Sequence, residues 1–255
     1  MIGAFDSGIG GLTVVKAIWE RLPSMPLIYF GDTARTPYGN KSAEVVSGYG
    51  VEIAEFLIKQ GATILVVACN TVSAVGMEAL RKKFPKVPIF EVITPAVSKV
   101  KEVSKKKRVG IIGTRALVGS NIYPSLLSGF KVFQESAPLL VPLVEENWLD
   151  KPEAKRIVKA YLQPLKQQQV DSLVLACTHY PLLKKVITPR AGKRVTIIDP
   201  GEETAIALQS YLNDNPDTKP LVGESRFYVS DVTPHFQKIA ELWLKRKIKL
   251  EKVIL

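Results

Sequence analysis

The sequence has few of the residues that build disulfide frameworks and no segment suited to crossing a membrane. Only two cysteines and two histidines occur in 255 residues, which is too few for a disulfide scaffold. No apolar run approaches the roughly 18 residues of a membrane span, and no low-complexity segment occurs. The first residues also lack the charged segment and cleavage site of a secretory signal, so we expect a cytoplasmic protein without a membrane partner.

The chain is rich instead in apolar residues and in positive charge. Hydrophobic residues make up 46% of the sequence, enough for the cores of one large or two ordinary α/β domains. The formal net charge is +11, but basic runs such as Lys105 to Arg108 fall at expected helix ends, where cations complement the helix dipole. Because no nucleic-acid-binding module accompanies these runs, we expect attraction for small anions and no nucleic-acid partner.

Two stretches of the chain resemble each other and define its organisation. Leu65 to Ala74 and Leu173 to Leu182 each read as a buried strand that ends in Ala-Cys and continues with small hydrogen-bonding residues. The two cysteines of the chain therefore hold equivalent places. An offset of 107 likewise aligns Ile2 to Ser7 with Val109 to Thr114. A repeat of this length indicates two duplicated domains rather than a solenoid.

Strand-like and helix-like segments alternate along the chain, which is typical of parallel sheets covered by crossover helices. The expected strands are residues 2–5, 27–30, 63–68, 88–93, 108–113, 131–134, 173–176, 195–198 and 227–229. The expected helices are residues 12–22, 42–60, 70–84, 94–107, 153–168, 200–212 and 234–244. The stretch from Pro138 to Glu146 reads as a loop, because it is too rich in proline for a central strand.

The predicted fold class is therefore α/β, with two similar parallel-sheet domains. We place the junction between the halves in the helix expected at residues 94–107 and treat residues 213–224 as a polar link. The C-terminal tail should pack back on the first half, which would otherwise be the smaller one. The first domain then comprises residues 1–95 and 213–255, and the second comprises residues 96–212.

Polar and thiol side chains follow the expected strands at the points where ligands bind in open parallel sheets. These residues are Asp6, Ser7, Cys69, Asn70, Thr71, Thr114, Cys177, Thr178 and His179. If the halves face each other, Cys69 and Cys177 meet across one cleft. A thiol beside a helix N-terminus can have a lowered pKa, and the thiolate can act as a base. Two such groups on opposite sides of a cleft suit racemisation, in which one removes a proton from carbon and the other delivers one to the opposite face.

Simpler interpretations exist for several of these residues. A lone cysteine at a strand end is usually a small buried hydrophobe, but two matched cysteines favour function. His179 could cap a helix and Asp6 could be an N-cap, although both could also take or hand on a proton. The glycines of residues 8–11 lack the spacing of a nucleotide-binding loop. We expect His235 to cap a helix or to face solvent.

At these residues the sequence resembles the glutamate racemases of the cofactor-independent aspartate/glutamate racemase superfamily. The matching stretches are Phe5 to Leu12, Gly31 to Gly39, Val67 to Thr71, Pro138 to Glu146 and Ala176 to Leu183. The histidine of Cys177-Thr178-His179 favours glutamate racemases, because the aspartate racemases of the superfamily typically have Glu there. The departures are small: Ala176 stands where glycine is usual, and Ser136 where many relatives carry cysteine.

The resemblance implies two α/β domains related by pseudo-twofold symmetry, with the active site in the cleft between them. Cys69 and Cys177 would transfer the protons, assisted by Asp6, His179 and one carboxylate of the Glu145-Glu146 pair, of which we favour Glu146. The implied substrate contacts are Asp6, Ser7, Tyr38, Gly39, Asn70, Thr71, Thr114, Thr178 and His179. The implied reaction converts L-glutamate to D-glutamate for peptidoglycan synthesis, in a homodimer with neither cofactor nor metal.

Other functions remain open from the residues alone. A racemase of the same superfamily could act on aspartate or another amino acid. A zinc or redox module could use Cys69, Cys177 and His179, although no Cys-x-x-Cys occurs and no fourth ligand is evident. A pyridoxal-dependent racemase would need a Schiff-base lysine, and no single lysine stands out.

Overall fold

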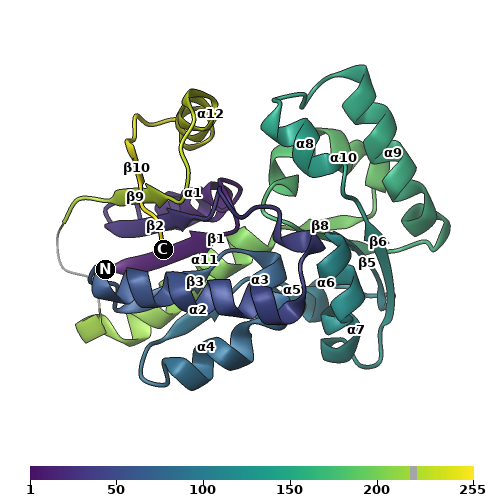
Figure 1. The fold of residues 1–255 in the computed structure, drawn as a ribbon. Coiled ribbons are helices and arrows are strands. Elements are labelled where there is room, and N and C mark those ends of the chain that lie inside the picture. The colour runs from purple at the N-terminus through teal and green to yellow at the C-terminus, as the bar shows by residue number, and fades with distance from the viewer. Residues whose placement is uncertain (219–222) are drawn as a thin grey trace.

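Two separate parallel β-sheets carry the fold, as seen in a computed structural model that describes residues 1–218 and 223–255 (Figure 1). The first sheet has six strands in the order β10-β9-β2-β1-β3-β4, and the second has four in the order β6-β5-β7-β8. The strands of the first sheet are β1 (Ile2–Asp6), β2 (Leu27–Gly31), β3 (Ile64–Val67), β4 (Ile89–Glu91), β9 (Arg226–Val229) and β10 (Leu250–Lys252). Those of the second are β5 (Arg108–Gly113), β6 (Lys131–Ser136), β7 (Ser172–Ala176) and β8 (Thr196–Ile198).

The two sheets repeat the same arrangement. The order β2-β1-β3-β4 in one corresponds to β6-β5-β7-β8 in the other. The register repeats as well: Gly3 pairs with Leu65 in the first sheet, and Gly110 pairs with Leu173 in the second. Each cysteine comes just after the third strand of its half. The duplication predicted from the sequence is therefore present in the strand pairing.

Helices cover both faces of the first sheet, because successive side chains of its strands point to opposite faces. On one face, Ile64 and Val66 pack against α1 (Leu12–Arg21). On the other, Leu65 and Val67 pack against α2. The helices between β2 and β5 in the chain are α2 (Ala43–Lys59), α3 (Asn70–Val75), α4 (Met77–Lys83) and α5 (Ile93–Val103).

The second sheet is covered in the same way, and one core cluster extends across both halves. Val174 packs with α5 on one face, whereas Leu173 and Leu175 join the same hydrophobic cluster as α1 on the other. The remaining helices are α6 (Arg115–Ser120), α7 (Ile122–Leu126), α8 (Leu140–Glu145), α9 (Pro152–Gln167), α10 (Lys184–Ala191), α11 (Pro200–Asp214) and α12 (Pro234–Leu244). Helix α11 packs against both α1 and α5, so it joins the helical layers of the two halves.

The C-terminal tail returns to the first sheet, as predicted. Strand β9 pairs in parallel with β2, β10 pairs with β9, and α12 packs against α1. The proposed boundaries of the two domains stay a prediction, and residues 219–222 of the expected link lie outside the described residues. Across the described part of the chain, no helix combines the length and the apolar character needed to cross a membrane.

The structure corrects two of the predicted elements. The stretch from Pro138 to Glu146 contains helix α8 rather than only a loop. Pro142 is compatible with this helix because it is the third residue, where the backbone N–H has no intrahelical partner. The helix predicted at residues 70–84 is divided at Gly76 into α3 and α4, since glycine is a poor helix former. Helices α6, α7 and α10 and strand β10 were not predicted.

Asp32 holds the end of β2 in place from a fully buried position. Its carboxylate accepts hydrogen bonds from Arg35 Nε at 2.6 Å and Ser230 Oγ at 2.7 Å, and also from the Tyr38 hydroxyl. It thereby connects β2, the loop that follows and the C-terminal tail.

Removing this carboxylate should therefore destabilise the fold. We expect Asp32→Ala to lower the free energy of unfolding by about 3 kcal/mol, because the buried Tyr38 hydroxyl and Arg35 lose their acceptor. Glu55→Ala is the matched control: its carboxylate is exposed and pairs with Lys59 at 3.3 Å, so a loss below about 1 kcal/mol is expected. Urea unfolding measures both. Equal losses in the two variants would contradict the assigned role of Asp32.

Candidate active site

The carboxyl ends of the two sheets border one cavity of about 40 Å³, and both cysteines line it. Its lining consists of Asp6, Ser7, Thr36, Pro37, Tyr38, Gly39, Cys69, Asn70, Thr71, Thr114, Val141, Cys177, Thr178 and His179. The structure thus brings together every residue predicted to contact a substrate. Of the predicted catalytic residues, it leaves out only Glu146.

The two cysteines are held by similar local structures. Cys69 is the N-cap of α3, and its carbonyl oxygen accepts a hydrogen bond from the Ser73 N–H at 2.9 Å. The carbonyl oxygen of Cys177 accepts one from the Tyr180 N–H at 3.1 Å, in the turn after β7. Both thiols are free and buried. The chain therefore presents two unpaired thiols to one cavity.

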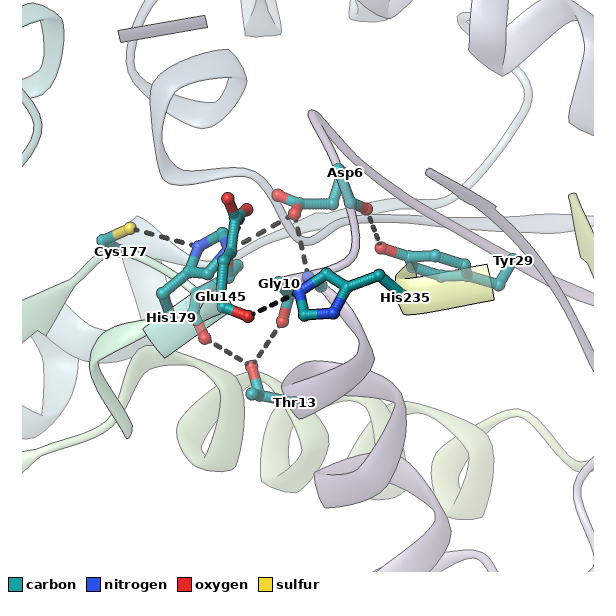
Figure 2. A network of polar contacts seen from close by, with 11 residues as sticks. Asp6, Gly10, Thr13, Tyr29, Glu145, Cys177, His179 and His235 are labelled. Carbon is teal, nitrogen blue, oxygen red and sulfur yellow. Dashed lines mark hydrogen bonds and ion pairs between the residues drawn. The ribbon is translucent and has the colours of Figure 1, made fainter. Parts of the chain in front are cut away.

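A histidine and a carboxylate support Cys177 (Figure 2). His179 Nδ1 lies 3.8 Å from the Cys177 sulfur, and His179 Nε2 lies 3.1 Å from Glu145 Oε1. Burial lowers the pKa of His179, but its hydrogen bonds to Cys177 and Glu145 outweigh burial and raise the pKa to about 10. At neutral pH His179 is thus an imidazolium that donates from both ring nitrogens.

The carboxylate next to His179 belongs to Glu145, so the choice of Glu146 does not match the geometry. Glu146 is exposed and lines a separate surface pocket with Leu139 and Trp148. Consecutive residues of a helix point about 100° apart, so only one of the pair can face the cavity. Because this stretch was predicted to be a loop, no helical periodicity was available to distinguish Glu145 from Glu146.

Asp6 lies on the Cys69 side of the cavity. Its Oδ2 accepts a hydrogen bond from the Gly11 N–H at 2.8 Å and one from Thr178 Oγ1 at 3.4 Å. Burial raises the pKa of Asp6, and the charge of His179 and nearby N–H groups offset this only in part. Asp6 therefore connects the two halves at the floor of the site.

The surroundings of Cys69 favour the protonated thiol. Burial, followed by the negative charge of Asp6, raises the pKa of Cys69 to about 12. Hydrogen bonds from the N–H groups of Val72 and Ser7 act in the opposite direction but are weaker. The expectation that a helix N-terminus lowers the pKa of this thiol is therefore wrong for Cys69, because desolvation outweighs it.

Two glycines after β1 allow close packing at the site. A Cβ atom on Gly10 would lie 2.4 Å from Thr178 Oγ1 of the opposite half, and one on Gly11 would lie 2.5 Å from Asp6 Cβ within the same half. Thr13 Oγ1 donates to the Thr178 carbonyl oxygen at 2.8 Å across the same contact. This motif therefore serves packing between strand ends rather than phosphate binding.

The cavity offers both acceptors and donors to a small polar molecule. Among the described residues, Asp6 Oδ1 and Asn70 Oδ1 are buried without a hydrogen-bond partner, and both residues line the cavity. Such oxygens can accept from an ammonium group. The hydroxyls of Ser7, Thr71 and Thr114 also line it and can donate to a carboxylate. This combination suits a zwitterionic ligand.

The zinc alternative finds no support in the described ranges, residues 1–218 and 223–255. They contain no group of three or more His, Cys, Asp or Glu side chains placed to hold a metal ion. Cys69, Cys177 and His179 line one cavity without forming such a group.

Three residues that line the cavity were not predicted. Thr36 and Pro37 line the cavity and lie within the Gly31 to Gly39 stretch, so the motif itself could have indicated them. Val141 also lines it, but it lies in the stretch read as a loop. The prediction that His235 caps a helix agrees with the structure, because His235 Nε2 lies 3.0 Å from the backbone oxygen of Glu145 at the end of α8.

Comparisons with known proteins agree with this geometry. The sequence matches the family model described as Asp/Glu/Hydantoin racemase over residues 12–208. A glutamate racemase from Syntrophus aciditrophicus is 42% identical over 253 residues, which cover 97% of this chain and 93% of that protein.

Solved structures with the same fold cover almost the whole chain. A glutamate racemase isoform from Bacillus anthracis is 38% identical with a TM-score of 0.95, and the match covers 100% of this chain and 97% of that one. A glutamate racemase from Francisella tularensis, solved in complex with D-glutamate, is 35% identical with a TM-score of 0.91; coverage is 99% of this chain and 96% of that one.

The raised pKa of His179 predicts a loss of stability at alkaline pH. The unfolded histidine releases its proton near pH 6.5, whereas the folded one holds it until about pH 10. The contribution of the imidazolium is therefore present below about pH 6.5 and is lost as the pH rises toward 10. We expect wild type to lose about 3 kcal/mol more than His179→Asn over this range.

Urea unfolding of both proteins at several pH values between 6 and 10 measures this difference. Titrating groups on which His179 does not act, such as Cys69, are common to both proteins, so their contributions largely cancel in the comparison. Parallel pH dependences for the two proteins would show that His179 holds no extra proton in the folded state.

Proposed function

Because this chain belongs to the Asp/Glu/hydantoin racemase family, we propose that it is a glutamate racemase that interconverts L- and D-glutamate through two cysteines and without a cofactor. The observation that carries the proposal is that Cys69 and Cys177, from equivalent places in two repeated sheets, line one cavity. Relatives named glutamate racemase over nearly the whole chain support this substrate.

In the proposed mechanism, one cysteine thiolate removes the α-proton of glutamate and the other thiol protonates the opposite face of the carbanion. The Cα–H bond breaks as an S–H bond forms on one side, while an S–H bond breaks as the new Cα–H bond forms on the other. The net result is inversion at Cα and a reversed protonation state of the two cysteines. The reverse reaction uses the same groups in exchanged roles.

The two cysteines work in different surroundings. The imidazolium of His179 places a positive charge 3.8 Å from the Cys177 sulfur. The high pKa of Cys69 favours its thiol at neutral pH. We therefore propose Asp6 as the group that can accept the Cys69 proton, and His179 as the group that assists proton transfer at Cys177.

Substrate binding is proposed to use hydroxyl and amide groups. Among the residues that the structure describes, no lysine or arginine lines the cavity. The carboxylates would therefore be bound by the hydroxyls of Ser7, Thr71, Thr114 and Thr178 and by backbone N–H groups, including that of Gly39. The ammonium group would be held by Asp6 and Asn70. Tyr38 would close one wall of the site.

Several wider expectations belong to the same proposal. We propose that D-glutamate from this reaction supplies peptidoglycan synthesis in the cytoplasm, and that the protein acts as a homodimer. Residues 1–95 with 213–255, and residues 96–212, are proposed as the two domains that bracket the substrate.

Replacing either cysteine should abolish racemisation. We expect Cys69→Ala and Cys177→Ala each to lower turnover by about 10³-fold or more, because one of the two proton transfers loses its group. The serine variants should be severely impaired, since a hydroxyl is a much weaker acid. Circular dichroism of reactions started from each glutamate enantiomer measures turnover. Ser136→Ala, outside the cavity, is the control, and substantial turnover by either alanine variant would refute the two-base mechanism.

The substrate can be identified by deuterium exchange. In deuterated water we expect solvent deuterium to enter the α position of glutamate but not that of aspartate or alanine, as measured by proton NMR. Activity should persist in chelator, and the purified protein should show no cofactor absorbance band. Exchange with aspartate and not with glutamate would identify a different racemase.

A further inference from the structure

Helix α12, from the C-terminal tail, contacts the group that supports Cys177 at two points. Near its start, His235 Nε2 lies 3.0 Å from the backbone oxygen of Glu145 (Figure 2). Near its end, the Trp243 ring meets the His179 ring edge-on, with 6.0 Å between ring centroids and 90° between planes. One helix therefore contacts both partners of the His179–Glu145 pair.

The contact made by His235 is a hydrogen bond of known direction. A carbonyl oxygen can only accept, so His235 Nε2 carries the proton and donates it. Glu145 is the last residue of α8, where helix carbonyls have no intrahelical partner. His235 thus caps the end of α8 from a different part of the chain, as histidines near helix C-termini can do.

This cap connects the two halves of the molecule. Helix α12 packs against α1 of the first half, whereas α8 packs against the turn after β7 and against α9. The first turn of α12, which carries His235, is held by Thr233 Oγ1, which caps the helix by accepting the Phe236 N–H at 3.1 Å. Helix α8 has only six residues, so a contact at its last carbonyl bears directly on where the Glu145 side chain points.

We propose that His235 is a positioning residue for proton transfer at Cys177: it holds the end of α8 so that the Glu145 carboxylate stays on His179 Nε2 and His179 Nδ1 faces the sulfur. This inference rests on the proposed racemase function. Trp243 supports the same arrangement by limiting rotation of the His179 ring. The Cys69 side of the cavity has no equivalent contact from α12 among the hydrogen bonds of the described residues.

The first test compares His235→Ala with wild type and with Lys238→Ala, an exposed position one turn later on the same helix. Wild type must racemise glutamate, and if it does not, the proposed function itself fails. We expect His235→Ala to lower kcat/KM about 3- to 10-fold, equally in both directions because the equilibrium constant is unity. His235→Gln should restore most of the activity, since its side-chain N–H can reach the same carbonyl, and Lys238→Ala should match wild type.

Isotope effects distinguish positioning from general loosening of the structure. With α-deuterated L- and D-glutamate, slower proton transfer at Cys177 should raise the deuterium isotope effect on kcat/KM for the enantiomer that Cys177 deprotonates. It should lower the effect for the other enantiomer, since the unlabelled step at Cys177 then limits the rate. A general loss of folding would change neither of the two deuterium isotope effects.

Unchanged kinetics in His235→Ala, or isotope effects that move in the same direction for both enantiomers, would overturn the inference. Thermal unfolding of each variant shows whether it is folded. If His235→Ala does not fold, His235→Asn replaces it, because the shorter amide keeps a polar side chain at this position but does not reach the Glu145 carbonyl.

Discussion

The site depends on one contact, between the turns that follow β1 and β7. The Thr178 hydroxyl donates a hydrogen bond to the Asp6 carboxylate, and the Thr178 carbonyl oxygen accepts one from the Thr13 hydroxyl. Gly10 makes this contact possible, because a side chain there would collide with Thr178 and His179 of the opposite half. With these turns in contact, the carboxyl ends of the two sheets face each other, and the cysteines that follow β3 and β7 meet at one cavity.

A duplicated scaffold places its two sulfur atoms alike but does not make them chemically alike. Cys177 has a cationic partner in His179, whose pKa is raised by its hydrogen bonds to Cys177 and Glu145. Cys69 has a buried carboxylate, Asp6, as its neighbour, and desolvation dominates its titration. The difference arises from Asp6 at the end of β1, His179 in the turn after β7 and Glu145 on α8. Symmetry therefore governs the position of the two sulfur atoms, whereas the neighbouring side chains give each one a different charge environment.

The sequence was sufficient to predict two duplicated α/β halves, every strand except β10, the return of the tail and most residues that line the cavity. These follow from apolar periodicity and from a repeat that sequence reading detects directly. The order of the strands within the sheets was not predicted. The sequence was also insufficient for α8, because prolines were read as loop signals although Pro142 occupies a position that tolerates them. A loop offers no helical face by which to choose between Glu145 and Glu146.

The remaining misses have a different cause. The raised pKa of Cys69 depends on burial and on the distance to Asp6, neither of which a local pattern contains. Capping by His235 was predicted, but the acceptor is a backbone oxygen 90 residues away, so the sequence did not indicate which helix His235 caps. The domain boundaries and the roles of the site residues stay predictions.

The return of the tail to β2 affects how the protein is made. All strands of the second sheet lie between residues 108 and 198, whereas the first sheet needs residues 226–252 beside β2. During synthesis on the ribosome the edge of β2 thus stays unpaired until almost the whole chain has emerged. An open parallel edge can pair with other nascent chains, so this last strand pairing both completes the first sheet and ends its exposure to aggregation.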